Sequence, residues 1–162
     1  MIPYIKGVIS VFTYNDMLVE ADDNNLIAKE KPLKAHKGLI DGRNIAIKKD
    51  MTETEKKCVM AEELGHYYTA TGEILDQSSV SNRKLELRGR AFAYNKLVGL
   101  TGIVGAYKHG CASLTESAEY LDVTEEFLAE ALNYYKAKYG KGARIDNYMI
   151  YFEPCLGVFE MI

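Results

Sequence analysis

The sequence predicts an α+β domain, with strands near the start, helices through the middle and strands again at the end. Three observations support this prediction. Alternating apolar residues around Asp41-Gly42 indicate a hairpin, helical signals dominate residues 52–139, and two apolar segments separated by Pro154 end the chain. With 162 residues, of which 48% are hydrophobic, the chain can bury one core, so we expect a single domain spanning residues 1–162.

The first third of the chain alternates between short strands and turns. Strands are expected at 8–12, 25–33 and 43–48, and a weak helix at 14–24. Pro32 ends the second strand. Asp41-Gly42 predicts a two-residue hairpin turn, because both positions tolerate positive φ angles. Ile45 and Ile47 alternate with polar residues, which indicates a half-buried strand.

The middle of the chain predicts four helices, at about 52–69, 82–98, 114–121 and 124–138. Thr52 and Glu55 form a capping-box pattern at the start of the first. Four glycines predict a flexible loop between the second and third helices: Gly99, Gly102, Gly105 and Gly110. Residues 147–154 and 156–162 predict two terminal strands.

Composition and charge argue against several classes of protein. The net charge of −3 gives no sign of binding to nucleic acid or to an anionic membrane. Three cysteines, Cys58, Cys111 and Cys155, are widely spaced and predict reduced thiols. The apolar N-terminal segment is too short to cross a bilayer and lacks a signal-peptide pattern, so a cytoplasmic protein is expected.

The segment AEELGH, residues 61–66, is close to the zinc-binding helix signature H-E-x-x-H, with Glu62 in place of the first histidine. Glu62 and His66 are four residues apart and therefore share one helix face. Gly65 costs about 1 kcal/mol relative to alanine in a helix interior, so its presence indicates a close approach by backbone or ligand. The alternative is an ordinary ion pair between Glu62 and His66.

Glu86 lies on the next predicted helix, on the face opposite Lys84 and Arg88 and beside Gly89 and Ala93. A carboxylate in a buried arc is costly unless it is paired or coordinates a cation. One alternative is a buried salt bridge with Arg90. The other is a third metal ligand, as in zinc peptidases that take a glutamate from a later helix.

These residues resemble a known family. The segments TEKKCVMAEELGHYYTATGEILDQ and NRKLELRGRAFAYNKLV are similar to the ImmA/IrrE metallo-endopeptidases, in particular the short members of prophages and mobile elements. The resemblance covers about residues 14–139 and is strongest at 38–98. It implies a small zincin-like fold. Together with the elements predicted above, this gives a peptidase core at about 14–99, a helical pair at about 111–139 and C-terminal strands at about 145–162. It departs from the family pattern at Glu62.

The resemblance implies cleavage of a cytosolic helix-turn-helix repressor of a prophage or mobile element. Glu62, His66 and Glu86 are the expected metal ligands, and Glu63 is the expected general base. Zinc is the expected metal. Two anionic ligands shift the preference away from strict zinc, so manganese and iron are alternatives. In similar peptidases a strand like 43–48 binds the substrate as an added strand.

A second function from another class stays open, because Glu62 replaces a ligand histidine. The chain could be a catalytically degenerate ImmA/IrrE-like regulator that acts by protein–protein contact. Residues 114–132 have a helix-turn-helix pattern, but they contain six acidic residues and no lysine or arginine, so DNA binding is not expected. His36 and His109 are expected at the surface, and Cys58 is expected to be a structural thiol although it lies one turn before Glu62. The sequence leaves the oligomeric state undetermined.

Overall fold

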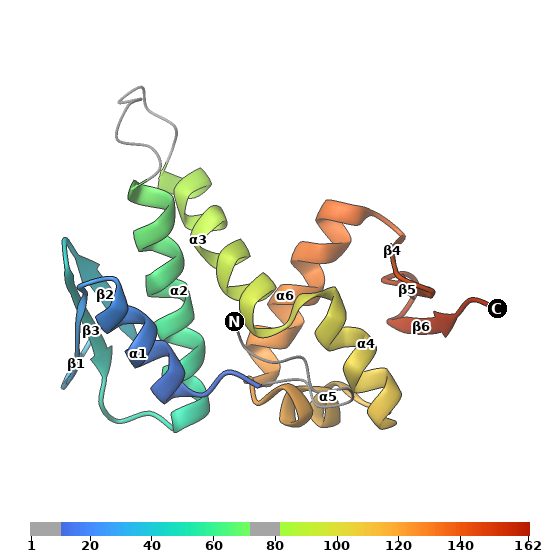
Figure 1. The fold of residues 1–162 in the computed structure, drawn as a ribbon, viewed down its shortest axis with the longest axis horizontal. Helices are drawn as coiled ribbons and strands as arrows, with labels where there is room; N and C mark the ends of the chain where they lie inside the picture. Colours follow the sequence, from blue (N-terminus) through green and yellow to red (C-terminus); the bar gives the residue numbers. More distant parts are fainter. Residues whose placement is uncertain (1–10, 72–81) are drawn as a thin grey trace.

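The structure, a computed structural model, describes residues 11–71 and 82–162 (Figure 1). In chain order its elements are α1 (Tyr14–Asp23), β1 (Ile27–Lys31), β2 (Gly38–Asp41), β3 (Asn44–Lys48), α2 (Glu53–Thr71), α3 (Asn82–Leu97), α4 (Gly99–His109), α5 (Leu114–Leu121), α6 (Glu125–Tyr139), β4 (Gly142–Ile145), β5 (Tyr148–Tyr151) and β6 (Gly157–Glu160). This order confirms the predicted α+β class. The strand expected at 8–12 lies largely outside the described residues, as does segment 72–81.

The first sheet has the strand order β1-β3-β2, with β3 parallel to β1 and antiparallel to β2. Asp41 pairs with Asn44, so the two-residue turn is Gly42-Arg43, one position later than expected. Gly42 has a φ of 57° and Arg43 a negative φ, which is the pattern of a turn with glycine at its first central position. Ile45 and Ile47 are buried beneath the helices, as their alternation predicted.

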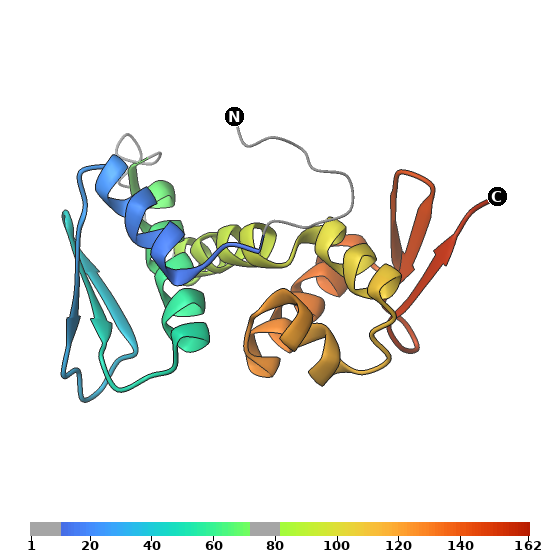
Figure 2. The same ribbon diagram turned by 60° about the horizontal axis from the view of Figure 1, so that its bottom comes forward.

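Helices α2 and α3 run side by side as an antiparallel pair (Figures 1 and 2). The predicted capping box is present: the Thr52 amide donates to Glu55 Oε2 at 2.8 Å and the Glu55 amide donates to Thr52 Oγ1 at 3.2 Å. The two helices approach most closely at Gly65 and Gly89. A Cβ atom at Gly65 would overlap the carbonyl oxygen of Gly89, so the crossing requires glycine.

Residues 99–109 form helix α4, so the prediction of a flexible glycine-rich loop was wrong. Gly99, at φ 61°, breaks the chain direction after α3, and Gly110, at φ 89°, ends α4 in a left-handed C-cap. Ile103 and Val104 bury the apolar side of the helix. Packing of that side outweighs the low helix propensity of its interior glycines. Helices α5 and α6 confirm the predicted pair.

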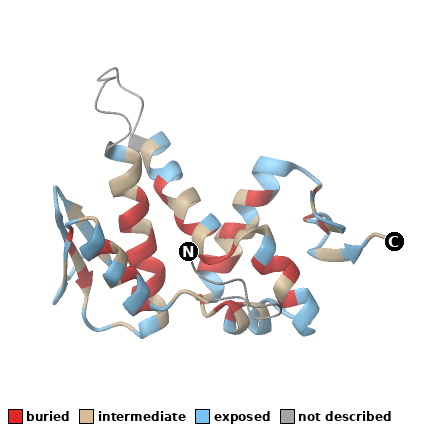
Figure 3. Cartoon of the chain, viewed as in Figure 1, coloured by how far each residue is buried: buried red, intermediate tan, exposed pale blue. Residues whose placement is uncertain are grey.

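The second sheet has the strand order β4-β5-β6 and is antiparallel throughout. Its two predicted strands are confirmed, and β4, which was not predicted, pairs with β5. Ile150 of β5 is fully buried and packs into the same hydrophobic cluster as the helices. Most of the sheet surface is exposed or half-buried (Figure 3).

One connected cluster of buried side chains extends from α1 to β5 (Figure 3). Polar contacts around Glu20 of α1 brace the three helices beside the first sheet. Glu20 accepts a hydrogen bond from the Tyr68 hydroxyl of α2 at 3.1 Å and pairs with Lys96 Nζ of α3 at 2.7 Å. These contacts hold α2 and α3 in the orientation that builds the site.

Candidate metal centre

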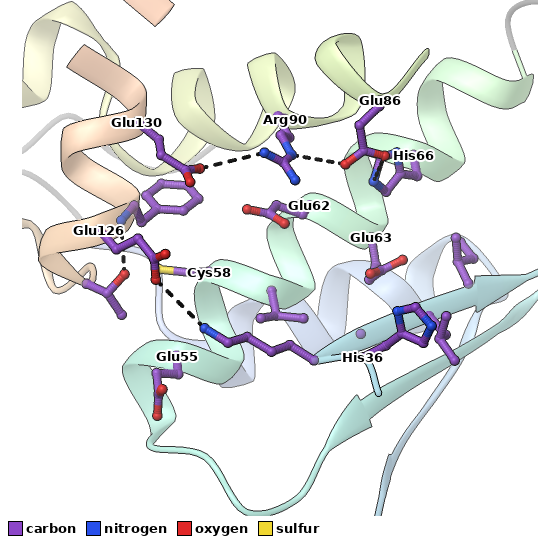
Figure 4. A pocket seen from close by; sticks show the side chains of 17 residues that line it. His36, Glu55, Cys58, Glu62, Glu63, His66, Glu86, Arg90, Glu126 and Glu130 are labelled. Carbon is purple, nitrogen blue, oxygen red and sulfur yellow. Dashed lines mark hydrogen bonds and ion pairs between the residues drawn. The ribbon is translucent and has the colours of Figure 1, made fainter. Parts of the chain in front are cut away.

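One face of α2 lines a cavity of about 510 Å³ (Figure 4). The lining residues of α2 recur at helical spacing: Glu55, Cys58, Val59, Glu62, Glu63 and His66. Strand β2, helix α3 and helix α6 supply the other walls. The cavity therefore collects the three α2 residues predicted for chemistry on one surface.

Glu86 of α3 reaches His66 across the helix pair. Its Oε2 lies 3.4 Å from His66 Nε2, so two of the three predicted ligands are in contact. Gly89 makes room for the imidazole, because a Cβ atom there would overlap His66 Nδ1 and lie 2.7 Å from its Cε1. The glycine pair thus positions the histidine as well as the helices.

Arg90 binds the other side of Glu86. Its Nε donates to Glu86 Oε1 at 3.0 Å, and its NH1 atom lies 3.9 Å from Glu130 Oε2 of α6 (Figure 4). Glu130 in turn accepts a hydrogen bond from the Tyr94 hydroxyl at 2.8 Å. The two alternatives for Glu86, contact with His66 and a salt bridge with Arg90, are therefore realised together.

Glu62 and Glu63 face the cavity without a hydrogen bond or ion pair to any described residue. Burial raises the pKa of Glu62 to about 7, with Glu130 and Glu86 adding to the shift and Arg90 opposing it. Burial also raises the pKa of Glu63 to about 7, reinforced by Glu62 and Glu86. Carboxylates thus outnumber the cations at this cavity, where Arg90 and Lys37 are the basic side chains of the lining.

The donor chemistry of this site fits a divalent cation. One imidazole and neighbouring carboxylates suit zinc, manganese or iron. His66 and Glu86 already converge, and Glu62 is one helical turn from His66. Within residues 11–71 and 82–162, the side chains of His, Cys, Asp and Glu form no group of three that could bind one metal ion. The predicted three-residue cluster is therefore not formed among the described residues, although His66 and Glu86 are in contact.

The burial expected for Glu86 is wrong. Its side chain is 49% exposed, although it lies on the helix face that meets α2. The face is not sealed at this position because the cavity opens there. The cost of burying a carboxylate therefore falls on Glu62 and Glu63 rather than on Glu86.

A family model described as the IrrE N-terminal-like domain, of the M78 peptidases, matches residues 20–133. The chain belongs to this family. The resemblance seen in the sequence is thereby confirmed, and the protein contains a metallopeptidase-type domain, for which the family implies a metal ion. A search of curated proteins gave no match to the chain.

The IrrE-like match extends past α3 through α5 and into α6. Helix α6 contributes Glu126, Phe127 and Glu130 to the cavity wall, so the second helix of the pair takes part in the cavity. None of the helices in the described part of the chain has both the length and the apolar character needed to cross a bilayer.

The strand at 44–48 cannot take an added strand, because β3 is the central strand of its sheet and pairs with β1 and β2. In the described residues, β2 has no neighbour on its other side, and it lines the cavity of the IrrE-like domain. Its Gly38 lies against the base candidate: a Cβ atom there would be 2.6 Å from Glu63 Oε1. Of the two edge strands of this sheet, β2 is the one that lines the cavity.

The remaining predicted residues lie as follows. Cys58 is buried at the cavity wall, and burial raises the pKa of its thiol to about 11, which keeps it protonated. His36 is exposed but lines the cavity rim. His109 is exposed, and its ring lies 4.8 Å from that of Tyr120.

Sequence analysis missed three features of the site. Glu130 and Gly38 lie on elements distant in sequence, so only the tertiary packing reveals them. Arg90 was recognised only as an ion-pair partner of Glu86. The spacing of four residues between Glu86 and Arg90 indicated their ion pair. Nothing in the sequence indicated the second contact of Arg90, with Glu130 of α6.

Proposed function

We propose that this protein is a metal-dependent endopeptidase that cleaves a cytosolic helix-turn-helix repressor of a prophage or mobile element. The observation that supports it most strongly is the meeting of His66, Glu86, Glu62 and Glu63 at one cavity beside the free edge of β2. Zinc is the proposed metal, with manganese or iron as alternatives, because oxygen donors outnumber nitrogen donors.

Glu62, His66 and Glu86 are the proposed ligands. When bound, the metal would supply Lewis acidity at the scissile carbonyl and lower the pKa of a water molecule. Glu63 would accept a proton from that water and pass it to the leaving amine. Glu63 suits this role because its carboxylate is buried at the cavity beside the proposed ligand Glu62.

The substrate would lie as an extended segment along β2. Main-chain hydrogen bonds to the free edge would hold it, as in other cases of strand addition. Because Gly38 of β2 contacts the Glu63 carboxylate, a segment paired there would pass close to the general base. An extended loop or linker of a repressor meets this requirement, whereas a folded helix does not.

The test combines metal analysis with a cleavage assay on a helix-turn-helix repressor from the same element. We expect about one metal ion per chain in the purified protein. We expect Glu63→Gln to lower the cleavage rate by roughly 10²- to 10⁴-fold with metal content unchanged, because it removes only the base. Glu53→Gln, on the exposed first turn of the same helix, is the matched control and should cleave normally.

Metal-free protein that still inactivates the repressor without cutting it would refute the proposal. That result would support the regulator that acts by protein–protein contact.

A further inference from the structure

Arg90 contacts Glu86 in a way that leaves one carboxylate oxygen directed at His66. Its Nε donates to only one oxygen of Glu86, Oε1, at 3.0 Å. The second oxygen, Oε2, is left facing His66 Nε2 at 3.4 Å. The carboxylate is therefore held with one oxygen on its own helix and the other directed at the imidazole of α2.

The guanidinium itself is also held in place. Arg90 NH1 lies 3.9 Å from Glu130 Oε2, and Glu130 is fixed by the Tyr94 hydroxyl at 2.8 Å. Tyr94 is buried, so the chain of contacts from Glu86 through Arg90 and Glu130 ends in the hydrophobic core. This chain joins α3 and α6 at the cavity (Figure 4).

We propose that Arg90 is a positioning residue of the metal centre, which orients Glu86 as a ligand that offers one oxygen beside His66. This inference rests on the proposed function. Carboxylate ligands of metals are commonly fixed by such an outer hydrogen bond, and its loss weakens metal binding. Arg90 also places one positive charge among Glu62, Glu86 and Glu130, which offsets the second anionic ligand of the site.

A role in the stability of the fold explains the Arg90–Glu86 pair less well than a role in positioning Glu86. Both side chains are more than two-fifths exposed, and ion pairs of this kind contribute little to folding. Orientation instead depends on the planar guanidinium, which donates to Glu86 through Nε while its NH1 atom faces Glu130 at 3.9 Å. Lysine carries the charge but cannot reproduce this arrangement.

The test measures Zn(II) dissociation constants by competition with a chromogenic chelator, and the visible spectrum of the Co(II)-loaded protein. The variants are Arg90→Met and Arg90→Lys. Lys84→Met, which removes an exposed positive charge from the same helix, is the matched control. Thermal unfolding of the metal-free proteins monitors the fold.

We expect Arg90→Met to weaken Zn(II) binding by roughly 10- to 100-fold. Its Co(II) spectrum should change because Glu86 is no longer held in place, while its metal-free melting temperature stays near that of the wild type. Arg90→Lys should recover only a small part of the affinity, and Lys84→Met should match the wild type.

Arg90→Met that binds Zn(II) as tightly as the wild type, or more tightly, overturns the inference but leaves the proposed function standing. Arg90 would then either have no effect on metal binding or compete with the metal for Glu86. If the wild type binds none of Zn(II), Mn(II) and Fe(II), the proposed function fails and the inference fails with it.

Discussion

Glu62 and Glu63 are adjacent residues that differ in how the cavity surrounds them. Glu63 is 8% exposed and packs against Gly38, whereas Glu62 faces Arg90 and Glu130 across the cavity. Burial raises the pKa of both carboxyl groups from 4.5 to about 7. Folding of the metal-free protein therefore favours their protonated forms.

This shift predicts a pH dependence of stability. Because the pKa values are higher in the folded state than in the unfolded state, the stabilisation is fully present below pH 4.5 and is lost as the pH rises through 7. The free energy of unfolding of the metal-free protein, measured with urea, should decline across this window. Glu62→Gln and Glu63→Gln should each flatten the decline, and slopes equal to that of the wild type would contradict the assignment.

The helix spacing of Glu62, Glu63 and His66 was enough to predict their common place on α2. The contact of Glu86 with His66 was also predicted, although the burial expected for Glu86 was wrong. The partners of Arg90 could not be predicted, because Glu130 reaches the site only through the packing of α6 against α3. The openness of the cavity at Glu86 depends in the same way on tertiary structure.

At the scale of elements, the crossing of α2 and α3 determines where the histidine and the glutamate meet. Contact between Gly65 and Gly89 lets the two backbones approach within the reach of short side chains. The capping box at Thr52 and Glu55 fixes where α2 begins, and so which residues face α3. Local sequence signals thus determine the helix ends, and the glycines determine the distance between helices.

Gly65→Ala should destabilise the protein by about 1–3 kcal/mol in urea unfolding. The added methyl group would meet the backbone oxygen of Gly89, which cannot move away as a side chain could. This cost exceeds the gain of about 1 kcal/mol in helix propensity.

Gly102→Ala in α4 is the control for Gly65→Ala. There the added methyl group would meet only Leu121 Cδ2, at 3.0 Å, at the end of a flexible side chain. We expect little change in stability. Equal effects of the two substitutions would mean that close helix approach is not what Gly65 provides.

Glycine was interpreted differently in α2 and in α4, and the interpretation was wrong for α4. In α2 one glycine in an otherwise strong helical pattern signalled a close contact. In residues 99–110 the four glycines led to the prediction of a loop, although the apolar side chains between them pack in the core and stabilise α4. Whether a glycine packs or bends depends on the neighbouring element, which the local sequence does not specify.

At the scale of the whole molecule, an ion pair between a buried lysine and a half-exposed aspartate connects α2 to the turn between α5 and α6. Lys57 is 1% exposed, and its Nζ lies 2.6 Å from Asp122 Oδ2. Asp122 Oδ1 also accepts a hydrogen bond from the Thr54 hydroxyl at 2.7 Å. These contacts explain why Asp122, at a φ of 50°, occupies a turn position where glycine is usual.

Asp122→Gly should therefore destabilise the protein although glycine suits the backbone. Loss of the carboxylate leaves the Lys57 ammonium buried without its partner, at a cost of about 3 kcal/mol in urea unfolding. Lys57→Met should cost less, because the Asp122 side chain is 47% exposed and can be solvated. A glycine variant more stable than the wild type would show that the ion pair does not join the two parts.

The α+β class, the helical pair and the terminal strands were predictable from local patterns. The ion pair that connects α2 to the turn between α5 and α6 could not be predicted, because α2 is rich in charged residues and nothing marked Lys57 as buried. The joining matters for the site, since α6 supplies a wall of the cavity that α2 begins.

Within the described residues, β2 has an unpaired edge, and such an edge is a general risk for self-association. An unpaired strand that accepts a substrate can also accept the same strand of a second copy, the first step of edge-to-edge aggregation. β2 has only four residues, so two copies joined in this way would share a very short ladder. A substrate would add contacts with the cavity to the same few hydrogen bonds. The shortness of this strand therefore favours the substrate over a second copy of the protein.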